Sequence, residues 1–183
     1  MRAARERGER GLLITGAIGA GKTEVVLSLA GELRRQGLGV AGVASPRVLV
    51  AEGTVGYQVR DLATGEERPL CSLDPPGIPF RRFFFSPEGL AFANAALERA
   101  AKAADVVVAD EVGPLELSGG GFAPGIRTAL KSPAFLVLTV RPSLADAVRR
   151  WANLPTAPVV TVAAPPTLAE TGTLFDRAAG PSA

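Results

Sequence analysis

The chain has 183 residues, of which 47% are hydrophobic and 21% are charged. These values predict one globular domain over residues 1–183 and exclude a largely disordered chain. The sequence has no histidine and a single cysteine, Cys71. It therefore excludes imidazole-dependent nucleophiles, zinc sites with a histidine ligand, internal disulfides and two-cysteine redox motifs.

The net charge is only +2, and much of the positive excess lies in a basic N-terminal tail, residues 1–10. A single basic tail without aromatic residues disfavours a nucleic-acid partner. Lys22 and Glu24 cut short the apolar run after the tail, which argues against a signal peptide. No stretch reaches the ~18–20 apolar residues of a membrane span. We therefore expect a cytoplasmic protein that does not contact membranes.

The first predicted elements are a buried strand and an amphipathic helix. Leu12 to Thr15 is a short apolar run that stops at glycine, as a buried parallel strand does. From Lys22 to Gln36 apolar residues recur every three or four positions, which predicts a helix that Gly37 ends. A second strand is expected at Val40 to Ala44.

Residues 47–73 have a different pattern, in which apolar segments alternate with turn-rich ones. We expect strands near 48–50, 55–59 and 68–73, which predicts a β-hairpin or meander insertion. The segment LDPPGIPF is interpreted as a proline-rich connector, followed by a short strand over 81–85.

The second half alternates helices and strands. Ser86 and Pro87 are a typical helix start, and that helix is expected to run to about Ala103. Strands are then predicted over 105–109, 134–140 and 158–162, with helices over 121–131 and 143–151 between them. This alternation predicts an α/β fold with a mostly parallel central sheet flanked by helices. The Ala/Pro-rich tail, residues 164–183, is expected to carry no chemistry.

The strongest motif lies between the first strand and the first helix. It matches the phosphate-loop pattern G-x-x-x-x-G-K-[ST] at every position and sits in the required structural context. Glycines let successive backbone amides face a phosphate, and the helix N-terminus adds partial positive charge. Lys22 would contact the β and γ oxygens, and the Thr23 hydroxyl would bind Mg²⁺. The predicted nucleotide-binding residues are Gly16, Ala17, Ile18, Gly19, Ala20, Gly21, Lys22 and Thr23.

A second acidic site follows the apolar run that begins at Val106. A phosphate-loop enzyme needs a carboxylate at the end of a neighbouring buried strand to hold hydrated magnesium, and Asp110 is predicted to supply it. Glu111 would point differently from Asp110 on a strand and could act as the general base on a water in line with the γ-phosphate. We therefore predict Lys22 and Glu111 as catalytic residues and Thr23 and Asp110 as metal-binding residues.

With these motifs placed, the chain resembles the thermophilic-type nucleoside-triphosphatase family, which includes the cancer-related nucleoside-triphosphatase. The resemblance rests on the phosphate loop, on Gly53 to Tyr57 with the DLATGE segment after it, and above all on DEVGPLEL at Asp110 to Leu117. It covers residues 11 to 162 in order. It implies a RecA-like P-loop NTPase fold and Mg²⁺-dependent hydrolysis of several nucleoside triphosphates to diphosphates.

The chain departs from the family pattern at several positions. Thr54 replaces a common arginine and Tyr57 a common phenylalanine, and the family's acidic-then-arginine and late Asn/Arg signals are missing. Arg47, Arg81 and Arg82, or an arginine from another chain, could supply the missing charge.

Other residues leave their roles open. Glu116 could orient Glu111, orient the loop beside it, or be a solvated loop carboxylate. Trp151 and Phe83 to Phe85 could stack on a base, although core packing is favoured.

Two further functions are consistent with a phosphate loop. A small-molecule nucleotide or nucleoside kinase would transfer the γ-phosphoryl group to an acceptor, and a nucleotide-dependent binding module would use slow hydrolysis to time partner release. The sequence does not determine the preferred base, the physiological substrate or the oligomeric state.

Overall fold

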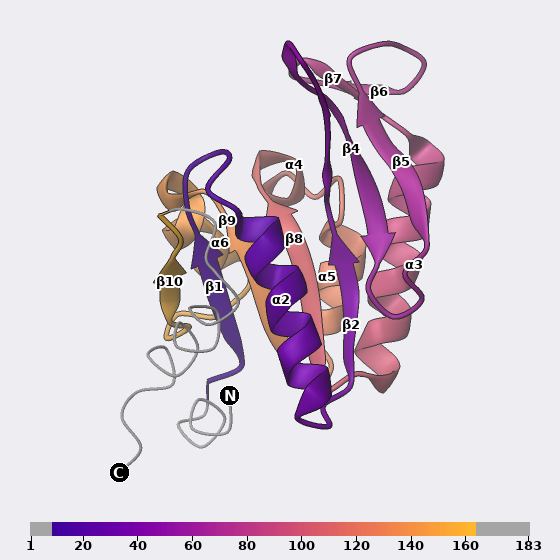
Figure 1. Cartoon of the computed structure of the whole chain (residues 1–183). Coiled ribbons are helices and arrows are strands. Elements are labelled where there is room, and N and C mark those ends of the chain that lie inside the picture. Colours follow the sequence, from indigo (N-terminus) through magenta and orange to yellow (C-terminus); the bar gives the residue numbers. More distant parts are fainter. Residues whose placement is uncertain (1–8, 164–183) are drawn as a thin grey trace.

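The computed structural model describes residues 9–163, which form one sheet with helices on both faces (Figure 1). Five neighbouring strands are parallel, in the order β10-β1-β9-β8-β2. They are β1 (Gly11–Thr15), β2 (Val40–Ala44), β8 (Val106–Val112), β9 (Phe135–Val140) and β10 (Val159–Thr161). The predicted α/β fold with a mostly parallel sheet is confirmed.

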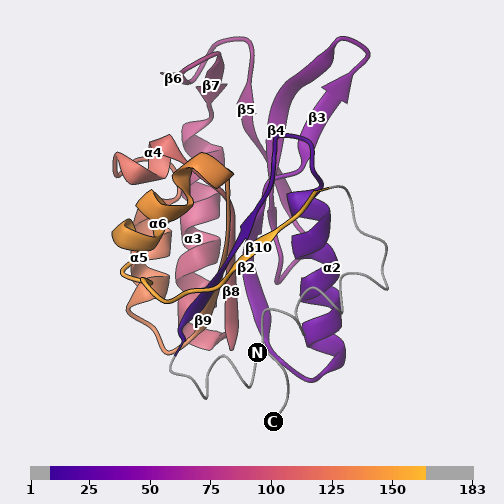
Figure 2. The same ribbon diagram turned by 90° about the vertical axis from the view of Figure 1, so that its left-hand side faces the viewer.

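Two hydrophobic cores lie on opposite faces of these parallel strands (Figure 2). Successive side chains of a strand point to opposite faces, so Leu13 belongs to one core and Leu12 and Ile14 to the other. Strands buried on both faces are apolar throughout, which explains their continuous Val and Leu runs. The helices are α2 (Lys22–Arg35) on one face and α3 (Pro87–Ala103), α5 (Ala123–Leu130) and α6 (Ala145–Trp151) on the other.

The insertion continues the sheet with antiparallel strands and projects beyond the edge where the parallel strands end (Figure 1). The insertion predicted over 47–73 contains β3 (Arg47–Val50), β4 (Gly53–Asp61) and β5 (Glu67–Ser72). The antiparallel sheet extends beyond the predicted range with β6 (Ile78–Phe80) and β7 (Phe83–Phe85), which are included in the insertion from here on. The prediction of a plain connector before Arg81 is wrong, because Ile78–Phe80 pairs with β7. Strand β6 is an edge strand of the sheet, so Pro79 can face the unpaired edge, where prolines are tolerated.

Three further boundaries differ from the prediction. Strand β8 passes through Asp110 and Glu111 to Val112 instead of ending at Ala109, with a bulge in its pairing to β9. A short helix, α4 (Pro114–Leu117), follows it, and the next helix begins at Ala123 because a glycine-rich turn precedes it. A 3₁₀ turn, η1 (Pro142–Leu144), precedes α6.

The predicted tails fall mostly outside the described residues: all of 164–183 and residues 1–8 of the basic tail. Within the described part of the chain, no helix combines the length and apolar character that a membrane span requires.

Candidate functional site: a phosphate loop facing an acidic strand end

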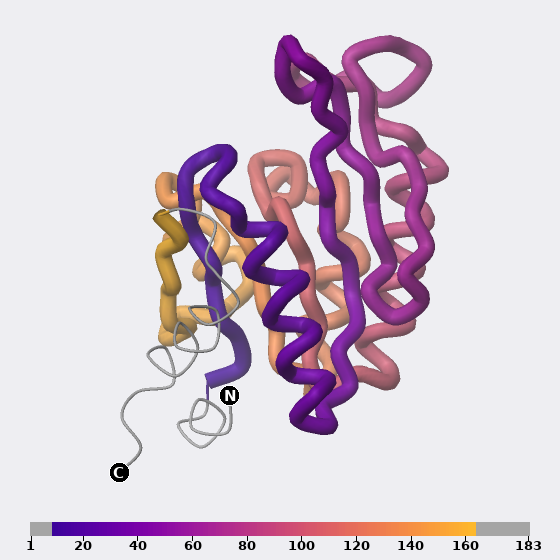
Figure 3. The backbone as a smooth tube through the Cα atoms, viewed as in Figure 1, coloured from indigo at the N-terminus to yellow at the C-terminus, as the bar shows by residue number. Residues whose placement is uncertain are grey.

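The phosphate loop connects β1 to α2 at the carboxyl edge of the parallel strands, below the projecting insertion (Figure 3). Gly19 and Gly21 have φ angles of +85° and +88°, in the left-handed region that favours glycine. A Cβ on Gly16 would lie 2.6 Å from the Val162 carbonyl oxygen, so this position also needs glycine. The glycine pattern of the motif therefore follows from the tight backbone path into the N-terminus of α2.

Lys22 is held inside the loop. Its side chain is buried, and Nζ donates hydrogen bonds to the carbonyl oxygens of Gly16 and Ala17, each at 3.1 Å. The ammonium group is thus positioned at the loop by weak neutral acceptors. A phosphate anion would be a stronger partner for the same charge.

Asp110 is fully buried and accepts three hydrogen bonds from three different elements. Thr23 Oγ1 donates to Oδ2 at 2.7 Å, and the Ser45 backbone N–H donates to the same oxygen at 3.0 Å. Thr139 Oγ1 donates to Oδ1 at 2.5 Å, and in turn accepts from the Glu111 backbone N–H at 2.7 Å. The network fixes the carboxylate directly beside the hydroxyl at the start of α2.

The oxygen atoms around Asp110 suit a magnesium ion. The Thr23 hydroxyl and the Asp110 carboxylate offer oxygen atoms of the kind that Mg²⁺ prefers as ligands, and the two oxygens are only 2.7 Å apart. The neighbouring Ser45 hydroxyl is buried without a hydrogen-bond partner. Its oxygen could therefore form a hydrogen bond with a water molecule that coordinates the metal. Residues 9–163 contain no cluster of three or more His, Cys, Asp or Glu side chains suited to a metal. A Mg²⁺ ion here would take its other ligands from water and phosphate, as it commonly does.

Glu111 has an unusual backbone conformation that separates its side chain from that of Asp110. Its φ angle is +64°, which is uncommon for a non-glycine residue, and it lies within the bulge of β8. Asp110 is enclosed, whereas Glu111 lines the pocket beside Lys22. Burial and the Asp110 charge raise the pKa of Glu111, opposed by the positive charges of Lys22, Arg141 and Arg47.

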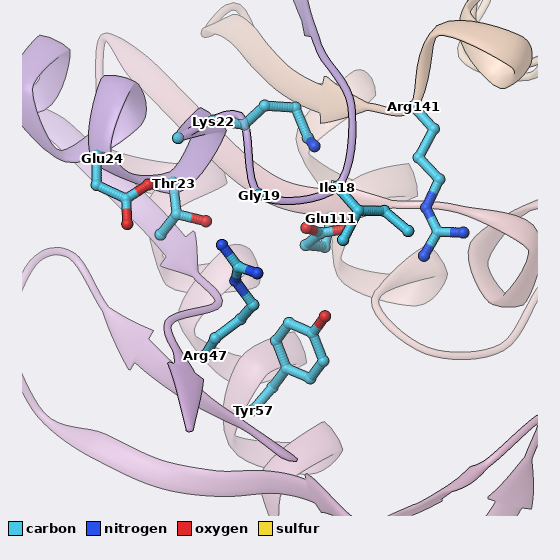
Figure 4. A pocket seen from close by; sticks show the side chains of 10 residues that line it. Ile18, Gly19, Lys22, Thr23, Glu24, Arg47, Tyr57, Glu111 and Arg141 are labelled. Atoms are coloured by element: carbon cyan, nitrogen blue, oxygen red, sulfur yellow. The ribbon is translucent and has the colours of Figure 1, made fainter. Parts of the chain in front are cut away.

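Four residues outside the two motifs complete this small pocket: Glu24, which follows the phosphate loop on α2, and Arg47, Tyr57 and Arg141 (Figure 4). Arg47 on β3 and Tyr57 on β4 reach toward the loop from the insertion, and Arg141 comes from the end of β9. The Arg47 guanidinium nitrogens lie 3.7 and 3.8 Å from the position that a Cβ on Gly19 would occupy. Burial and the Glu111 charge raise the pKa of Tyr57.

The sequence analysis missed Arg141. Its signal was its position immediately after the strand predicted to end at Val140, at the same edge as the phosphate loop. Of the three arginines proposed as substitutes, Arg47 lies at the loop, whereas Arg81 and Arg82 line a larger neighbouring cavity.

Glu116 is neither solvated nor in hydrogen-bond contact with Glu111. Its buried carboxylate accepts from the backbone N–H groups of Gly113 at 2.8 Å and Phe122 at 3.2 Å. Burial raises its pKa. The side chain ties the segment after β8 to the start of α5, which is a structural role.

The aromatic residues divide into two groups. Trp151 packs against the core, with the Arg127 guanidinium 6.0 Å from its ring centre. Phe85 packs partly against the same core, but Phe83 and Phe85 also line the larger cavity. Core packing is thus confirmed for Trp151 and incomplete for the phenylalanines.

A parallel sheet, a glycine-rich loop into a helix, and an acidic end on the strand one place beyond β9 define a P-loop nucleotide-binding protein. Residues 11–164 match the NTPase family, and the chain belongs to that family. Its relatives include the nucleoside-triphosphatase THEP1 of Thermococcus kodakarensis, 33% identical over 171 residues that cover 91% of this chain and 92% of the relative. The nucleoside-triphosphatase THEP1 of Thermofilum pendens is 35% identical over 133 residues, which cover 72% of this chain and 73% of the relative.

Two solved structures share the fold. The crystal structure of THEP1 from Aquifex aeolicus has a TM-score of 0.69 at 21% identity, covering 91% of this chain and 96% of that one. The solution structure of a human cancer-related nucleoside triphosphatase has a TM-score of 0.64 at 21% identity, covering 92% and 95%. The predicted family and its P-loop NTPase fold are therefore confirmed.

Proposed function

We propose that this protein is a Mg²⁺-dependent hydrolase that converts nucleoside triphosphates, ATP and GTP among them, to the diphosphate and phosphate. The observation that carries the proposal is the 2.7 Å hydrogen bond between Thr23 and Asp110, with Lys22 and Glu111 lining one pocket above it. This arrangement joins the phosphate loop to the acidic strand end. The names of the THEP1 relatives support the same activity.

Each residue has a distinct role in the proposed mechanism. The loop amides and the N-terminus of α2 bind the β-phosphate, and Lys22 exchanges its carbonyl partners for β and γ oxygens. Thr23 and Asp110 would hold Mg²⁺, which neutralises phosphate charge when bound, and Ser45 would orient one of its waters. Glu111 accepts the proton of the attacking water.

Arg47 and Arg141 complete the positive lining around the γ-phosphate. Charge on the equatorial oxygens of the transferring phosphoryl group is stabilised by such fixed cations. The proposed contacts involve phosphate, the metal ion and the attacking water, and none involves a base, which supports broad nucleotide specificity.

Steady-state hydrolysis of the common ribo- and deoxyribonucleoside triphosphates, with Mg²⁺ and with a chelator, tests the proposal. We expect Mg²⁺-dependent release of free phosphate from several of them. The Lys22→Ala variant, purified in parallel, controls for contaminating phosphatases. Absence of metal-dependent phosphate release from every nucleotide would overturn the proposal.

A further inference from the structure

A second, much larger cavity adjoins the phosphate-loop pocket. Its volume is about 590 Å³, within the ~300–1,000 Å³ range of small-molecule sites. Ile18, Tyr57, Glu111 and Arg141 line both spaces, so the two adjoin at these four residues. Hydrolysis requires one water beside Glu111, for which ~10–15 Å³ is enough. The cavity therefore has room for a second molecule at the place where the nucleophile enters.

The position of the cavity argues against its being the site of the nucleoside. In phosphoryl transfer the attacking and leaving oxygens lie on opposite sides of the γ-phosphorus. Because Glu111 would face the attacking oxygen, the diphosphate and its nucleoside extend away from Glu111. The cavity includes Glu111 but not Gly19, Lys22 or Thr23. It is thus on the acceptor side of the reacting phosphate.

The lining combines aromatic rings with positive charge. Its apolar part comes mainly from the insertion, from α4 and from the start of α5, and includes Leu70, Phe80, Phe83, Phe85, Leu115 and Phe122. Such surfaces bind flat ring systems by stacking and by burial of apolar area. The charged part comprises Arg81 and Arg82 in the turn between β6 and β7, and Arg141 at the end of β9.

The arginines of the turn are available to a ligand. The guanidinium of Arg82 lies 4.8 Å from the Phe83 ring centre and that of Arg81 lies 5.8 Å from the Phe80 ring centre. Both residues are exposed, and within residues 9–163 neither forms an ion pair. Arg82 also donates one hydrogen bond, to the Thr54 carbonyl oxygen at 3.2 Å, which leaves its other donors available. The two acidic residues of the lining do not pair with these arginines: Glu116 accepts from two backbone amides, and Glu111 lies at the phosphate-loop end.

We propose that this cavity binds a nucleoside monophosphate and presents its phosphate as an acceptor for the γ-phosphoryl group. The ring system would pack on the phenylalanines, and the arginines would offset the repulsion between two phosphates. An acceptor oxygen forms the new bond to the γ-phosphorus. The bond to the β–γ bridging oxygen breaks, and its electron pair stays on the departing diphosphate. The products are two nucleoside diphosphates, and any proton on the attacking oxygen passes to Glu111.

This inference rests on the proposed triphosphate site but extends beyond hydrolysis. With only water in the cavity the reaction yields free phosphate, and with an acceptor bound it yields a second diphosphate. The structure thereby favours the kinase alternative as an additional activity at the same centre.

The test begins with binding. The protein is saturated with Mg²⁺ and a non-hydrolysable triphosphate, so that the phosphate loop is filled, and calorimetry measures binding of AMP, GMP, CMP, UMP and dTMP. Radiolabelled γ-phosphate is then followed from ATP to free phosphate and to labelled diphosphate in the presence of each monophosphate. The variants are the double substitution Arg81→Gln with Arg82→Gln, and Arg35→Gln as a control on the exposed surface of α2.

We expect at least one monophosphate to bind the saturated protein and to accept label. The double variant should lower transfer at least tenfold while changing acceptor-free hydrolysis less than twofold, and Arg35→Gln should change neither. Absence of monophosphate binding at millimolar concentration would overturn the inference, whether or not hydrolysis occurs. Binding without transfer would overturn the acceptor role, and transfer insensitive to the double variant would overturn the location. Normal hydrolysis in each case would leave the proposed function intact.

Discussion

The parallel half of the sheet and the antiparallel insertion contribute to the site in different ways. The parallel half supplies Lys22, Thr23 and Asp110, which are buried or half-buried. Thr23 donates a hydrogen bond to Asp110, and Lys22 donates to carbonyl oxygens of its own loop. The insertion supplies Arg47 and Tyr57, whose half-exposed side chains approach from outside. The half that we propose to bind phosphate and metal is thus more enclosed than the half that faces it across the pocket.

This difference predicts that substitutions in the parallel half remove the chemistry, whereas substitutions in the insertion modulate it. The largest effects are expected where a charge is both buried and close to the reacting phosphate. Smaller effects are expected where solvent reaches the side chain.

Glu111→Gln should produce the largest loss, a slowing of the chemical step by roughly 10²–10⁴-fold, because the amide cannot accept the water proton. Binding of the triphosphate with Mg²⁺ should persist. Calorimetry and single-turnover hydrolysis on the same preparation measure the two separately. Glu88→Gln, on the exposed first turn of α3, is the control. Wild-type turnover in Glu111→Gln would remove Glu111 as the base.

Lys22→Ala should lower turnover on the order of 10²-fold or more, about 3 kcal/mol, because a fixed positive charge on the β and γ oxygens is lost. The fold should survive, since the hydrogen bonds lost are those to two loop carbonyls. Circular dichroism and phosphate release check both points, with the exposed Lys102→Ala as control. A folded variant with normal turnover would show that the loop does not bind the phosphates.

Thr23→Ala should raise the magnesium concentration required for activity about tenfold and lower turnover, because an oxygen ligand of the metal is removed. A high magnesium concentration should restore part of the lost turnover. Thr23→Ser keeps the hydroxyl that donates to Asp110 and should behave much like wild type. Magnesium titrations of activity compare the two. Identical titrations for Thr23→Ala and wild type would remove Thr23 from the proposed metal site.

Arg47→Ala tests the insertion and should lower kcat/KM by about tenfold, close to 1.4 kcal/mol. Its guanidinium lies beside Gly19, but the side chain is only half-buried, so solvent weakens its effect. Arg68→Ala, in the same insertion and away from both pockets, is the matched control. A loss as large as that of Lys22→Ala would break the distinction between the two halves.

Glu116→Ala should have the smallest effect on turnover, less than about threefold, but should lower the free energy of unfolding by roughly 1–3 kcal/mol. The substitution leaves the backbone N–H groups of Gly113 and Phe122 without their acceptor. Chemical denaturation measures the change, with the exposed Glu98→Ala as control. A large loss of turnover with unchanged stability would contradict the structural role.

The stability difference should also depend on pH. Burial raises the pKa of Glu116 in the folded state above its value in the unfolded state. At a pH between these two pKa values, the folded state therefore binds more protons than the unfolded state. The contribution of the neutral carboxyl to stability is complete below the unfolded pKa and is lost as the pH rises through the folded one. Denaturation across this window should show a smaller slope in Glu116→Ala than in wild type, with the remainder due to Glu111, whose pKa is also raised.

The sequence alone determined the parts of the site whose residues are adjacent in the chain. The phosphate loop was predictable because its amides, its lysine and its hydroxyl come from one strand–loop–helix segment, Gly16 to Thr23. Asp110 and Glu111 were predictable for a related reason, since the carboxyl ends of parallel strands meet at one edge of the sheet. Local hydrophobic patterns likewise predicted the parallel strands and the long helices.

Only the tertiary structure decided which distant residues join them. Pairing of β3 with β4 places Arg47, rather than Arg81 or Arg82, at the phosphate loop, and no local pattern distinguishes the three. Strand β6 and the cavity beside Glu111 also depend on contacts between separated segments. The physical reason is that side-chain periodicity reports which face of an element is buried, whereas strand register and packing determine what that face meets.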